Sequence, residues 1–208
     1  MRREGPYRGK RAFDLAAVTV LAAPALVLGA ACACAIKLDD GGPVLFRQER
    51  VGRDGRTFEL VKFRTMLHGV DNPLYPDASR VTRAGRLLRR LSLDELPQLI
   101  NVVKGDMSVV GPRPTLAYQV ERYTPEQRRR LAVRPGLTGL AQVRGRNTIT
   151  WAERIKLDLE YLDKQSLLYD AYVLLLSLRV VFAEEVGGHP LDDPIARLDA
   201  PAAPRVIA

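Results

Sequence analysis

Cysteine and histidine are scarce in this sequence of 208 residues, which contains two of each. Cys32 and Cys34 lie two positions apart inside an apolar run, so they cannot clamp distant chain segments together and have the character of small hydrophobic residues. His68 and His189 stand far apart, and neither has the neighbouring ligands expected of a zinc site. A disulfide framework and a His/Cys metal site are therefore disfavoured, and carboxylates are the expected ligands of any bound metal.

Aromatic residues are also few, at 6% of the chain with one tryptophan. The chain is basic, with 32 Lys and Arg against 24 Asp and Glu, which favours an anionic partner such as nucleic acid, phospholipid headgroups or a phosphorylated substrate. A membrane-anchored nucleic-acid-binding protein would explain the arginines through phosphate neutralisation. With so few aromatic residues, however, the chain offers little surface on which the bases of a single strand could stack. Nucleic-acid binding would also leave the acidic pair Asp94-Glu95 unexplained, so we expect no nucleic-acid partner.

Charge is missing altogether from residues 15–36, a run of about 22 residues that is long enough to span a membrane as a helix. A cleaved signal peptide is one interpretation, but the run is longer than a usual signal core and leads into Lys37 without a clear cleavage site. A simple spanning helix should have its basic residues on one side, whereas here they flank both ends. The third interpretation uses Pro24, which predicts a bend near the middle and a helix that enters and leaves by the same face.

The pattern after Pro43 changes to short strand-like runs. Residues 44–46 and 58–63 surround a Gly- and Asp-containing turn at 52–55, which predicts a β-hairpin. Residues 71–78 form a loop with two prolines, and residues 80–91 have the spacing of a strongly basic helix.

Three capping-box patterns predict helix starts at Ser92, Thr124 and Thr150. The first places Asp94 and Glu95 in the first turn of a helix that Gly105 ends. The second and third helices are expected to run to about residues 132 and 164. An apolar helix is predicted from about residue 167 to 186, followed by a disordered tail rich in Pro and Ala.

Cations that suit phosphate are dense between residues 62 and 147. Arginine forks match phosphate oxygens, and rigid Gly or Pro neighbours hold such forks in place. A solvated basic surface explains any single arginine, but clustering around the acidic pair Asp94-Glu95 favours a site. The candidate phosphate ligands are Lys62, Arg64, Arg80, Arg89, Arg113, Arg144 and Arg146.

The acidic pair has both a structural and a chemical interpretation. Carboxylates in a first helical turn interact favourably with the helix dipole, and Glu95 could simply close the capping box. Two adjacent carboxylates among cations could instead bind Mg²⁺, which bridges diphosphates, and a carboxylate can act as a nucleophile on phosphorus.

Four long motifs carry a family resemblance that covers about residues 10 to 185. They are Lys62-Phe-Arg-Thr-Met66, the segment Leu91-Ser-Leu-Asp-Glu-Leu-Pro-Gln-Leu-Ile-Asn101, the segment Lys104-Gly-Asp-Met-Ser-Val-Val-Gly-Pro-Arg-Pro114 and the segment Arg134-Pro-Gly-Leu-Thr-Gly-Leu-Ala-Gln-Val-Arg-Gly-Arg-Asn147. In this order they resemble the motifs of the bacterial sugar transferases, the small monotopic phosphoglycosyl transferases.

The resemblance implies transfer of a phosphosugar from a UDP-sugar to a polyprenyl phosphate such as undecaprenyl phosphate, with release of UMP. It implies that Asp94 is the nucleophile and a Mg²⁺ ligand, with Glu95 as its partner. Phosphate contacts are implied for Arg89, Arg113 and Arg146. The basic pair Lys10 and Arg11 is expected to meet the carrier phosphate or the phospholipid headgroups of the membrane.

The implied architecture is α+β and mostly helical, with a small β-hairpin and amphipathic helices at the membrane interface. Residues 1–11 form a basic segment, 12–36 a re-entrant membrane helix broken at Pro24, 37–187 a cytoplasmic catalytic domain and 188–208 a disordered tail. Many family members have serine before that proline, where this chain has Ala23, which leaves the bend angle open. The expected location is the cytoplasmic face of the bacterial inner membrane; a homodimer and a catalytically inactive scaffold are further alternatives.

Overall fold

The computed structural model describes residues 5–67, 80–145 and 149–182, with the backbone alone given for 180–182. The described chain is mostly helical with two small two-stranded sheets, as the α+β prediction requires. The predicted loop at 71–78 and the predicted tail at 188–208 lie outside the described residues.

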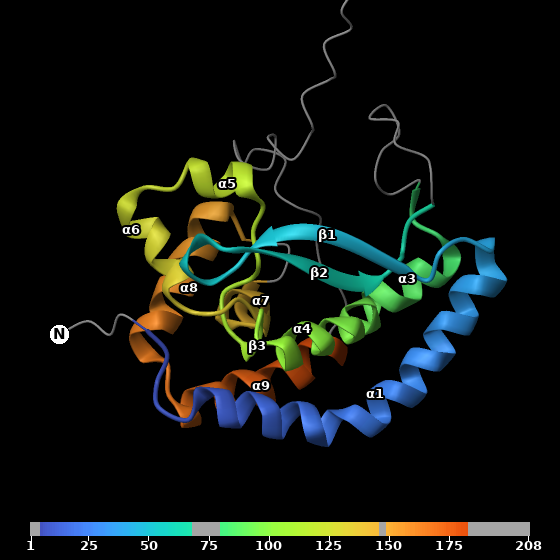
Figure 1. Cartoon of the computed structure of the whole chain (residues 1–208), viewed down its shortest axis with the longest axis horizontal. Helices are drawn as coiled ribbons and strands as arrows, with labels where there is room; N and C mark the ends of the chain where they lie inside the picture. The colour runs from blue at the N-terminus through green and yellow to red at the C-terminus, as the bar shows by residue number, and fades with distance from the viewer. Residues whose placement is uncertain (1–4, 68–79, 146–148, 183–208) are drawn as a thin grey trace, which may run out of the picture.

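The first helix, α1, extends over Lys10–Asp40, between Gly9 and Gly41, which both have left-handed backbone angles. Pro24 lies inside it, and the helix continues through this position, so the structure has a continuous helix here and not the predicted break. In Figure 1 the ribbon of α1 runs along the base of the molecule and then turns upward toward the β-hairpin. Within the described chain α1 is the one helix long and apolar enough to cross a membrane, and 11% of its most apolar window is buried.

The predicted β-hairpin is confirmed. Strand β1 (Leu45–Val51) pairs antiparallel with β2 (Thr57–Phe63), from Leu45 opposite Phe63 to Val51 opposite Thr57. The connection includes a 3-10 turn, η1 (Arg53–Gly55), which lies in the predicted turn region.

Three short helices follow the hairpin. They are α3 (Arg83–Arg90), the 3-10 helix η2 (Leu93–Gln98) and α4 (Leu99–Lys104), which ends at Gly105 as predicted. The predicted capping box at Ser92 is wrong: this residue has φ of 55° and its side chain caps nothing. Asp94 and Glu95 still lie in a first turn, but that turn is 3-10 because Pro97 disfavours α-helical geometry at the residue before it.

The remaining elements build the body of the catalytic part. Strand β3 (Ser108–Val110) pairs parallel with β4 (Gly136–Thr138), a pairing that the sequence did not predict. Helices α5 (Ala117–Glu121), α6 (Pro125–Arg128), η3 (Arg129–Ala132), α7 (Leu140–Gly145), α8 (Trp151–Lys164) and α9 (Leu167–Phe182) complete the described chain. The capping boxes at Thr124 and Thr150 are both confirmed.

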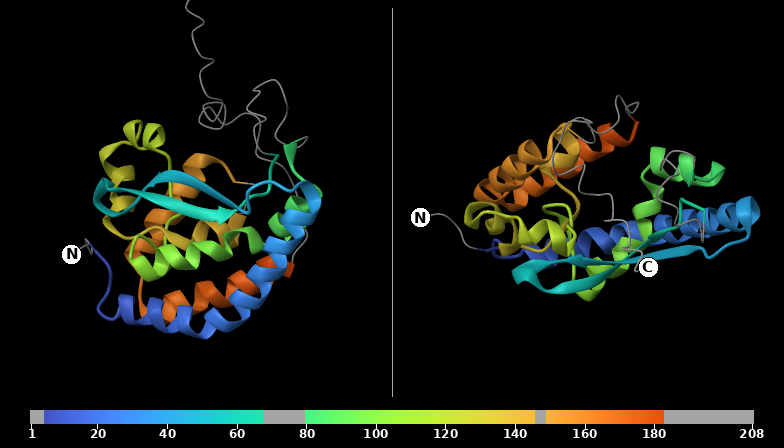
Figure 2. Two further views of the ribbon diagram at one scale, coloured as in Figure 1. Left: turned by 45° about the vertical axis from the view of Figure 1, so that its right-hand side comes forward. Right: turned by 90° about the horizontal axis from the view of Figure 1, so that it is seen from above.

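Two hydrophobic clusters hold these elements together. The larger joins β3, α4, α7, α8 and α9, and includes Val102, Met107, Leu140 and Val173. The smaller contains Cys32, Ile36, Phe63 and Leu88, and fastens the second half of α1 to β2 and α3. Seen from above, the hairpin and the α8–α9 pair lie on opposite sides of the molecule (Figure 2).

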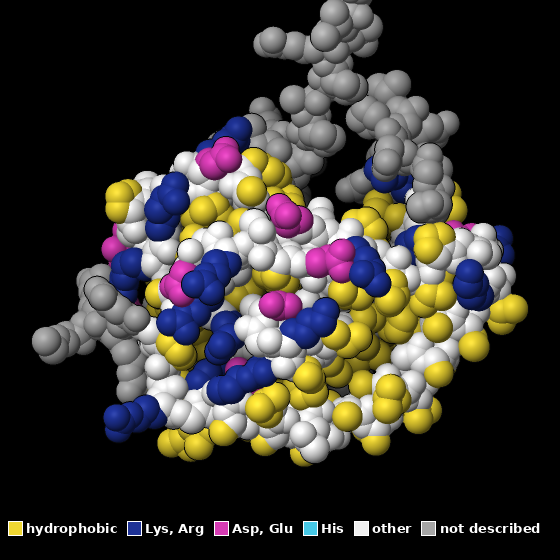
Figure 3. Space-filling view, in the orientation of Figure 1, with side chains coloured by type: hydrophobic (Ala, Val, Ile, Leu, Met, Phe, Trp, Pro, Cys, Tyr) yellow, Lys and Arg dark blue, Asp and Glu magenta, His cyan; other side chains and the backbone are white. Residues whose placement is uncertain are grey.

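Large apolar side chains remain exposed along α1 and α9. Val20, Leu26 and Val27 of α1 are more than 70% exposed, and Leu168 of α9 is 82% exposed. Figure 3 shows hydrophobic side chains along the lower and right-hand edges of the molecule, where α1 runs. An apolar helix with its large side chains exposed indicates association with a membrane.

Candidate active site

Asp94 lies in η2, between strand β2 and the second half of α1, and is 9% exposed. Among the described residues, no group donates a hydrogen bond to its carboxylate. Burial, and then the charge of Glu95, raise the pKa of Asp94 to about 6, although nearby cations act in the opposite direction. The carboxylate of Asp94 is therefore available to contact a ligand.

Lys62 is the first of three cations whose charges act on Asp94. It is the penultimate residue of β2, and its Nζ lies 5.2 Å from the centre of the Phe46 ring on β1. Burial, and the nearby charges of Arg113 and Arg89, lower the pKa of Lys62. A desolvated ammonium beside two guanidinium groups is well suited to bind an anion.

Arg89 is supplied by the last turn of α3 and held by the chain just after β2. Its Nε donates to Oγ1 of Thr65 at 2.9 Å, while the Thr65 carbonyl accepts from the amide of Thr82 at 3.1 Å. Gly85 packs directly on Thr65, where a Cβ would overlap the Thr65 carbonyl oxygen. This close approach fixes α3, and with it Arg89, against the end of the hairpin.

Arg113 lies at the centre of the Gly111–Thr115 turn that follows β3. Its Nη2 donates to Oε1 of Glu95 at 3.0 Å, and this charge raises the pKa of Arg113. The side chain of Arg113 is 46% exposed, so its remaining donors can reach a ligand. The structure therefore brings together five of the predicted residues: Asp94, Glu95, Lys62, Arg89 and Arg113.

The acidic pair suits Mg²⁺ bound jointly by protein and substrate. No group of three or more His, Cys, Asp or Glu side chains in the described ranges could hold a metal alone. Mg²⁺ commonly takes one or two carboxylates and completes its shell with water and substrate phosphates. Two adjacent carboxylates fit that donor set, so Asp94 and Glu95 are the residues that could hold Mg²⁺ together with a substrate diphosphate.

Arg64 differs from its prediction as a phosphate ligand. Its side chain is 5% exposed, and both terminal nitrogens bind the carboxylate of Asp40 at the end of α1. Further donors go to the carbonyls of Pro43, at 2.5 Å, and Met66, at 3.0 Å. The geometry assigns Arg64 to fastening α1 to β2, because no free edge of its guanidinium remains for phosphate.

The other predicted cations are placed less directly. Arg144 on α7 pairs through Nη1 with Glu160 of α8 at 3.2 Å and is 44% exposed, and its phosphate role stays a prediction. Arg80 lies next to the end of the hairpin, where its carbonyl accepts from the amide of Leu67, and its phosphate role stays a prediction. Arg146 lies outside the described residues.

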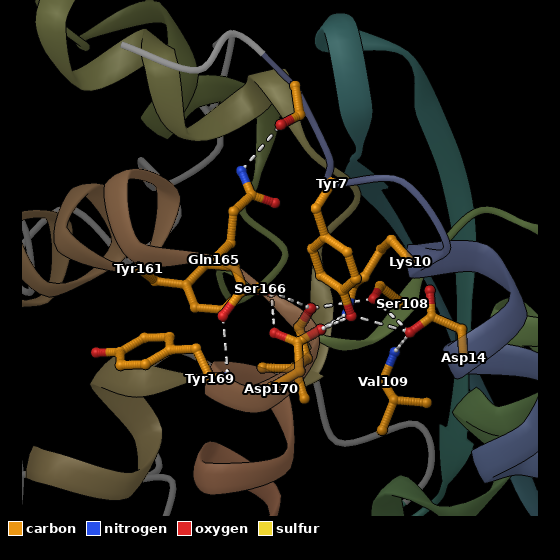
Figure 4. Close-up of polar contacts among 12 residues, drawn as sticks. Tyr7, Lys10, Asp14, Ser108, Val109, Tyr161, Gln165, Ser166, Tyr169 and Asp170 are labelled. Atoms are coloured by element: carbon orange, nitrogen blue, oxygen red, sulfur yellow. Dashed lines mark hydrogen bonds and ion pairs between the residues drawn. The ribbon is translucent and has the colours of Figure 1, made fainter. Parts of the chain in front are cut away.

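The basic pair Lys10 and Arg11, at the start of α1, binds other parts of the protein. Lys10 is 6% exposed and binds Asp170 at 2.5 Å and Asp14 at 3.2 Å, beside the ring of Tyr7 (Figure 4). Its ammonium is thus used inside the protein, in place of the predicted headgroup contact. Arg11 donates to the carbonyls of Val102 and Val103 at 2.5 and 2.7 Å, at the end of α4.

Sequence reasoning missed two residues that shape this site. Thr65 stands within a recognised motif, but its task of orienting Arg89 depends on a helix that packs across it. Arg50 of β1 adds a positive charge that acts on Lys62, and its guanidinium is held by Gln48. The hairpin register, which places Arg50 opposite Phe58, is the signal that could have drawn attention to it.

Together these features define a membrane-associated protein with a buried carboxylate, Asp94, on which the charges of Lys62, Arg113 and Arg89 act. A family model described as bacterial sugar transferase matches residues 6–184, so the chain belongs to that family and is a sugar-phosphate transferase. It is 46% identical over 178 residues to the uncharacterized sugar transferase EpsL of Bacillus subtilis, with 85% of this chain and 88% of the relative covered.

Two further relatives have more descriptive names. The UDP-glucose:undecaprenyl-phosphate glucose-1-phosphate transferase of Caulobacter vibrioides is 46% identical over 181 residues, which cover 80% of this chain and 67% of that protein. The exopolysaccharide production protein ExoY of Rhizobium meliloti is 39% identical over 194 residues, covering 83% of this chain and 84% of the relative.

Proposed function

We propose that this enzyme transfers a phosphosugar from a UDP-sugar to a polyprenyl phosphate, with undecaprenyl phosphate as the expected carrier, and releases UMP. The reaction would be the first membrane step in the assembly of a surface glycan or glycoconjugate. The observation that carries the proposal is the buried carboxylate of Asp94, with Lys62, Arg89 and Arg113 acting on it. The name of the relative from Caulobacter vibrioides supports the two substrate classes.

The reaction proceeds in two successive nucleophilic displacements at the same phosphorus atom. A carboxylate oxygen of Asp94 attacks the phosphorus that bears the sugar, and the bond from that phosphorus to the bridging oxygen breaks. UMP departs with the bridging oxygen and its electron pair, which leaves an aspartyl-phosphosugar. A phosphate oxygen of the polyprenyl carrier then attacks the same phosphorus, breaks its bond to Asp94 and restores the carboxylate.

The side chains around Asp94 have distinct tasks in both steps. Lys62, Arg89 and Arg113 offset the charge of the diphosphate and stabilise the charge that develops on its oxygens. Glu95 orients Arg113 through their ion pair. Mg²⁺, held by Asp94, would neutralise the diphosphate beside two carboxylates.

The membrane helix is proposed to be re-entrant, with both ends on the cytoplasmic side of the inner membrane. Both ends of α1 are fastened to the same catalytic body, through Lys10 to Asp170 of α9 and through Asp40 to Arg64 after β2. A helix of 31 residues is about 46 Å long, enough to cross a bilayer if straight. Because one folded body holds both ends, we infer that α1 dips into one leaflet, and a bend at Pro24 would permit this geometry.

Two measurements test the reaction. The purified protein is incubated with a panel of UDP-sugars, Mg²⁺ and undecaprenyl phosphate, and UMP release is measured. Without the lipid acceptor, intact-mass measurement after rapid quenching should show one phosphosugar on the enzyme, which added undecaprenyl phosphate removes.

Asp94→Asn keeps the shape of the side chain but loses its charge, so it should form no adduct and release no UMP; near-normal turnover would refute the assignment.

Removal of divalent metal provides a separate prediction. An excess of chelator should abolish UMP release, and added Mg²⁺ should restore it, because the diphosphate and the two carboxylates would otherwise repel one another. The thermal transition of the protein serves as the control for unfolding. Full activity in excess chelator would contradict the metal requirement while leaving the nucleophile intact.

A further inference from the structure

The turn that presents Arg113 is held along its backbone by several elements. The carbonyl of Pro112 accepts from the amide of Gly136 at 2.8 Å, and that of Thr115 accepts from the amide of Val51 at 2.8 Å. These two bonds fix the ends of the turn to β4 and β1. Arg113 lies between these two bonded residues. The orientation of its own peptide group therefore sets the direction in which its side chain extends from the turn.

The carbonyl of Arg113 accepts a hydrogen bond from a side chain far along the sequence. Nη2 of Arg130 donates to this oxygen at 3.1 Å and also binds Oδ2 of Asp158. Nη1 of Arg130 donates to the hydroxyl of Tyr123 at 2.5 Å. One guanidinium therefore joins the turn, α8 and the segment before α6.

Arg130 is deeply buried, at 2% exposure, and its side-chain ion pair with Asp158 is 1% exposed on each side. The guanidinium carbon lies 5.6 Å from the centre of the Tyr123 ring and 5.7 Å from that of Trp151. A buried ion pair is a costly way to fill a core, since apolar residues of similar volume often serve stability as well or better. The hydrogen bond to the turn gives this pair a task that an apolar residue could not perform.

We propose that Arg130 is a positioning residue for Arg113: it fixes the peptide of the phosphate-binding turn, and so the direction in which Arg113 approaches the donor diphosphate. This inference rests on the proposed function. Arg130 does not touch the substrate in this scheme, and its effect passes through the carbonyl of Arg113. Asp158 and Tyr123 hold Arg130 in the orientation that makes this bond.

Arg130→Lys is the sharpest variant. A lysine keeps the positive charge for Asp158, but its single ammonium cannot reproduce the planar fork that reaches three partners at once. Arg129→Lys is the matched control, because Arg129 is the preceding residue of η3 and pairs with Glu126 and Asp163 nearer the surface. The two variants make the same chemical change at adjacent positions.

UMP release is the first measurement. For Arg130→Lys we expect kcat/KM for the UDP-sugar to fall about tenfold or more, with a raised KM for the UDP-sugar and an unchanged KM for the lipid acceptor. Arg129→Lys should stay within about twofold of the wild type. Activity of Arg130→Lys within about twofold of the wild type would overturn the proposal.

A double-mutant cycle separates positioning from general weakening of the fold. If Arg130 acts through Arg113, the variant Arg113→Ala with Arg130→Lys should be no slower than Arg113→Ala alone. A double variant slowed by the product of the two single effects would show that Arg130 acts elsewhere, and would overturn the proposal.

A second route covers poor folding of the lysine variant. Replacing the whole pair, with Arg130→Met and Asp158→Leu together, removes the buried charges without leaving one unpaired. It should melt cooperatively and show the same loss of kcat/KM; wild-type activity in this variant would overturn the inference.

UDP affinity, measured by calorimetry, gives an independent readout: Arg130→Lys should weaken it about tenfold or more, and an unchanged affinity would also overturn the inference. Absence of UMP release by the wild type with every donor would refute the proposed function instead.

Discussion

The acid limb of the activity profile depends on the protonation of Asp94. Its pKa is raised to about 6 by burial and by Glu95, so the nucleophilic carboxylate is present above that pH and is lost as the pH falls through it. We expect kcat/KM to fall about tenfold per unit below pH 6. A profile that stays flat to pH 4.5 would contradict this assignment.

The substitution Glu95→Gln tests the cause of that shift. Loss of the neighbouring negative charge lowers the pKa of Asp94, so the acid limb should move to lower pH, although the maximum rate also falls because Arg113 loses its partner. Glu121→Gln, which changes an exposed carboxylate on α5, is the control and should leave the limb in place. An acid limb that stays in place or moves upward in Glu95→Gln would show that the charge of Glu95 does not raise the pKa of Asp94.

We predict that Arg64 supports the stability of the fold and that Arg89 supports catalysis. Arg64→Met leaves Asp40 without its partner at the end of α1, and should lower the free energy of unfolding by about 2–4 kcal/mol. Arg89→Met removes a partly buried cation that faces the site, and should lower kcat/KM at least about tenfold with little change in stability. Thermal melts and UMP release measured on both variants provide the comparison; the reverse pattern would exchange their roles.

At the scale of elements, the close packing of Gly85 in α3 against Thr65 positions Arg89 in the site. A Cβ at residue 85 would overlap the Thr65 carbonyl, so Gly85→Ala should push α3 away from the hairpin and lower kcat/KM along with stability. Ala84→Ser, on the preceding and less buried residue, is the control. A fully active and stable Gly85→Ala variant would show that this packing does not position Arg89.

At the scale of the whole molecule, the two ends of α1 should face the cytoplasm. Single reporter cysteines replace Arg8, just before α1, and Arg56 in the hairpin, which are both exposed. The background is Cys32→Ala with Cys34→Ala, because Cys32 is 5% exposed and an apolar replacement suits its surroundings. A membrane-impermeant thiol reagent should label neither position in spheroplasts, and both after permeabilisation.

Labelling of one end alone in intact spheroplasts would show that α1 crosses the bilayer. This result would overturn the re-entrant topology, yet the chemistry proposed for Asp94 could survive if the catalytic part stayed inside. A reporter cysteine in a known periplasmic protein confirms that the reagent reaches the outer face of the membrane.

Local chemistry allowed several features to be predicted from the sequence. The capping boxes at Thr124 and Thr150 join groups within a single helical turn, and the β-hairpin follows from a turn between two short apolar runs. The same logic failed at Ser92, where Pro97 favours a 3-10 turn and the serine adopts a left-handed conformation. Local rules are reliable where no nearby residue competes with them.

The sequence by itself determined the apolar character of α1, the acidic pair at Asp94 and the abundance of cations around it. Only the tertiary structure decided which cations face that pair. Lys62 and Arg64 are two residues apart, but β2 ends at Phe63 and the chain then turns, so one side chain approaches Asp94 while the other binds Asp40. A guanidinium binds whichever anion the fold brings to it, and these partners come from segments distant in sequence.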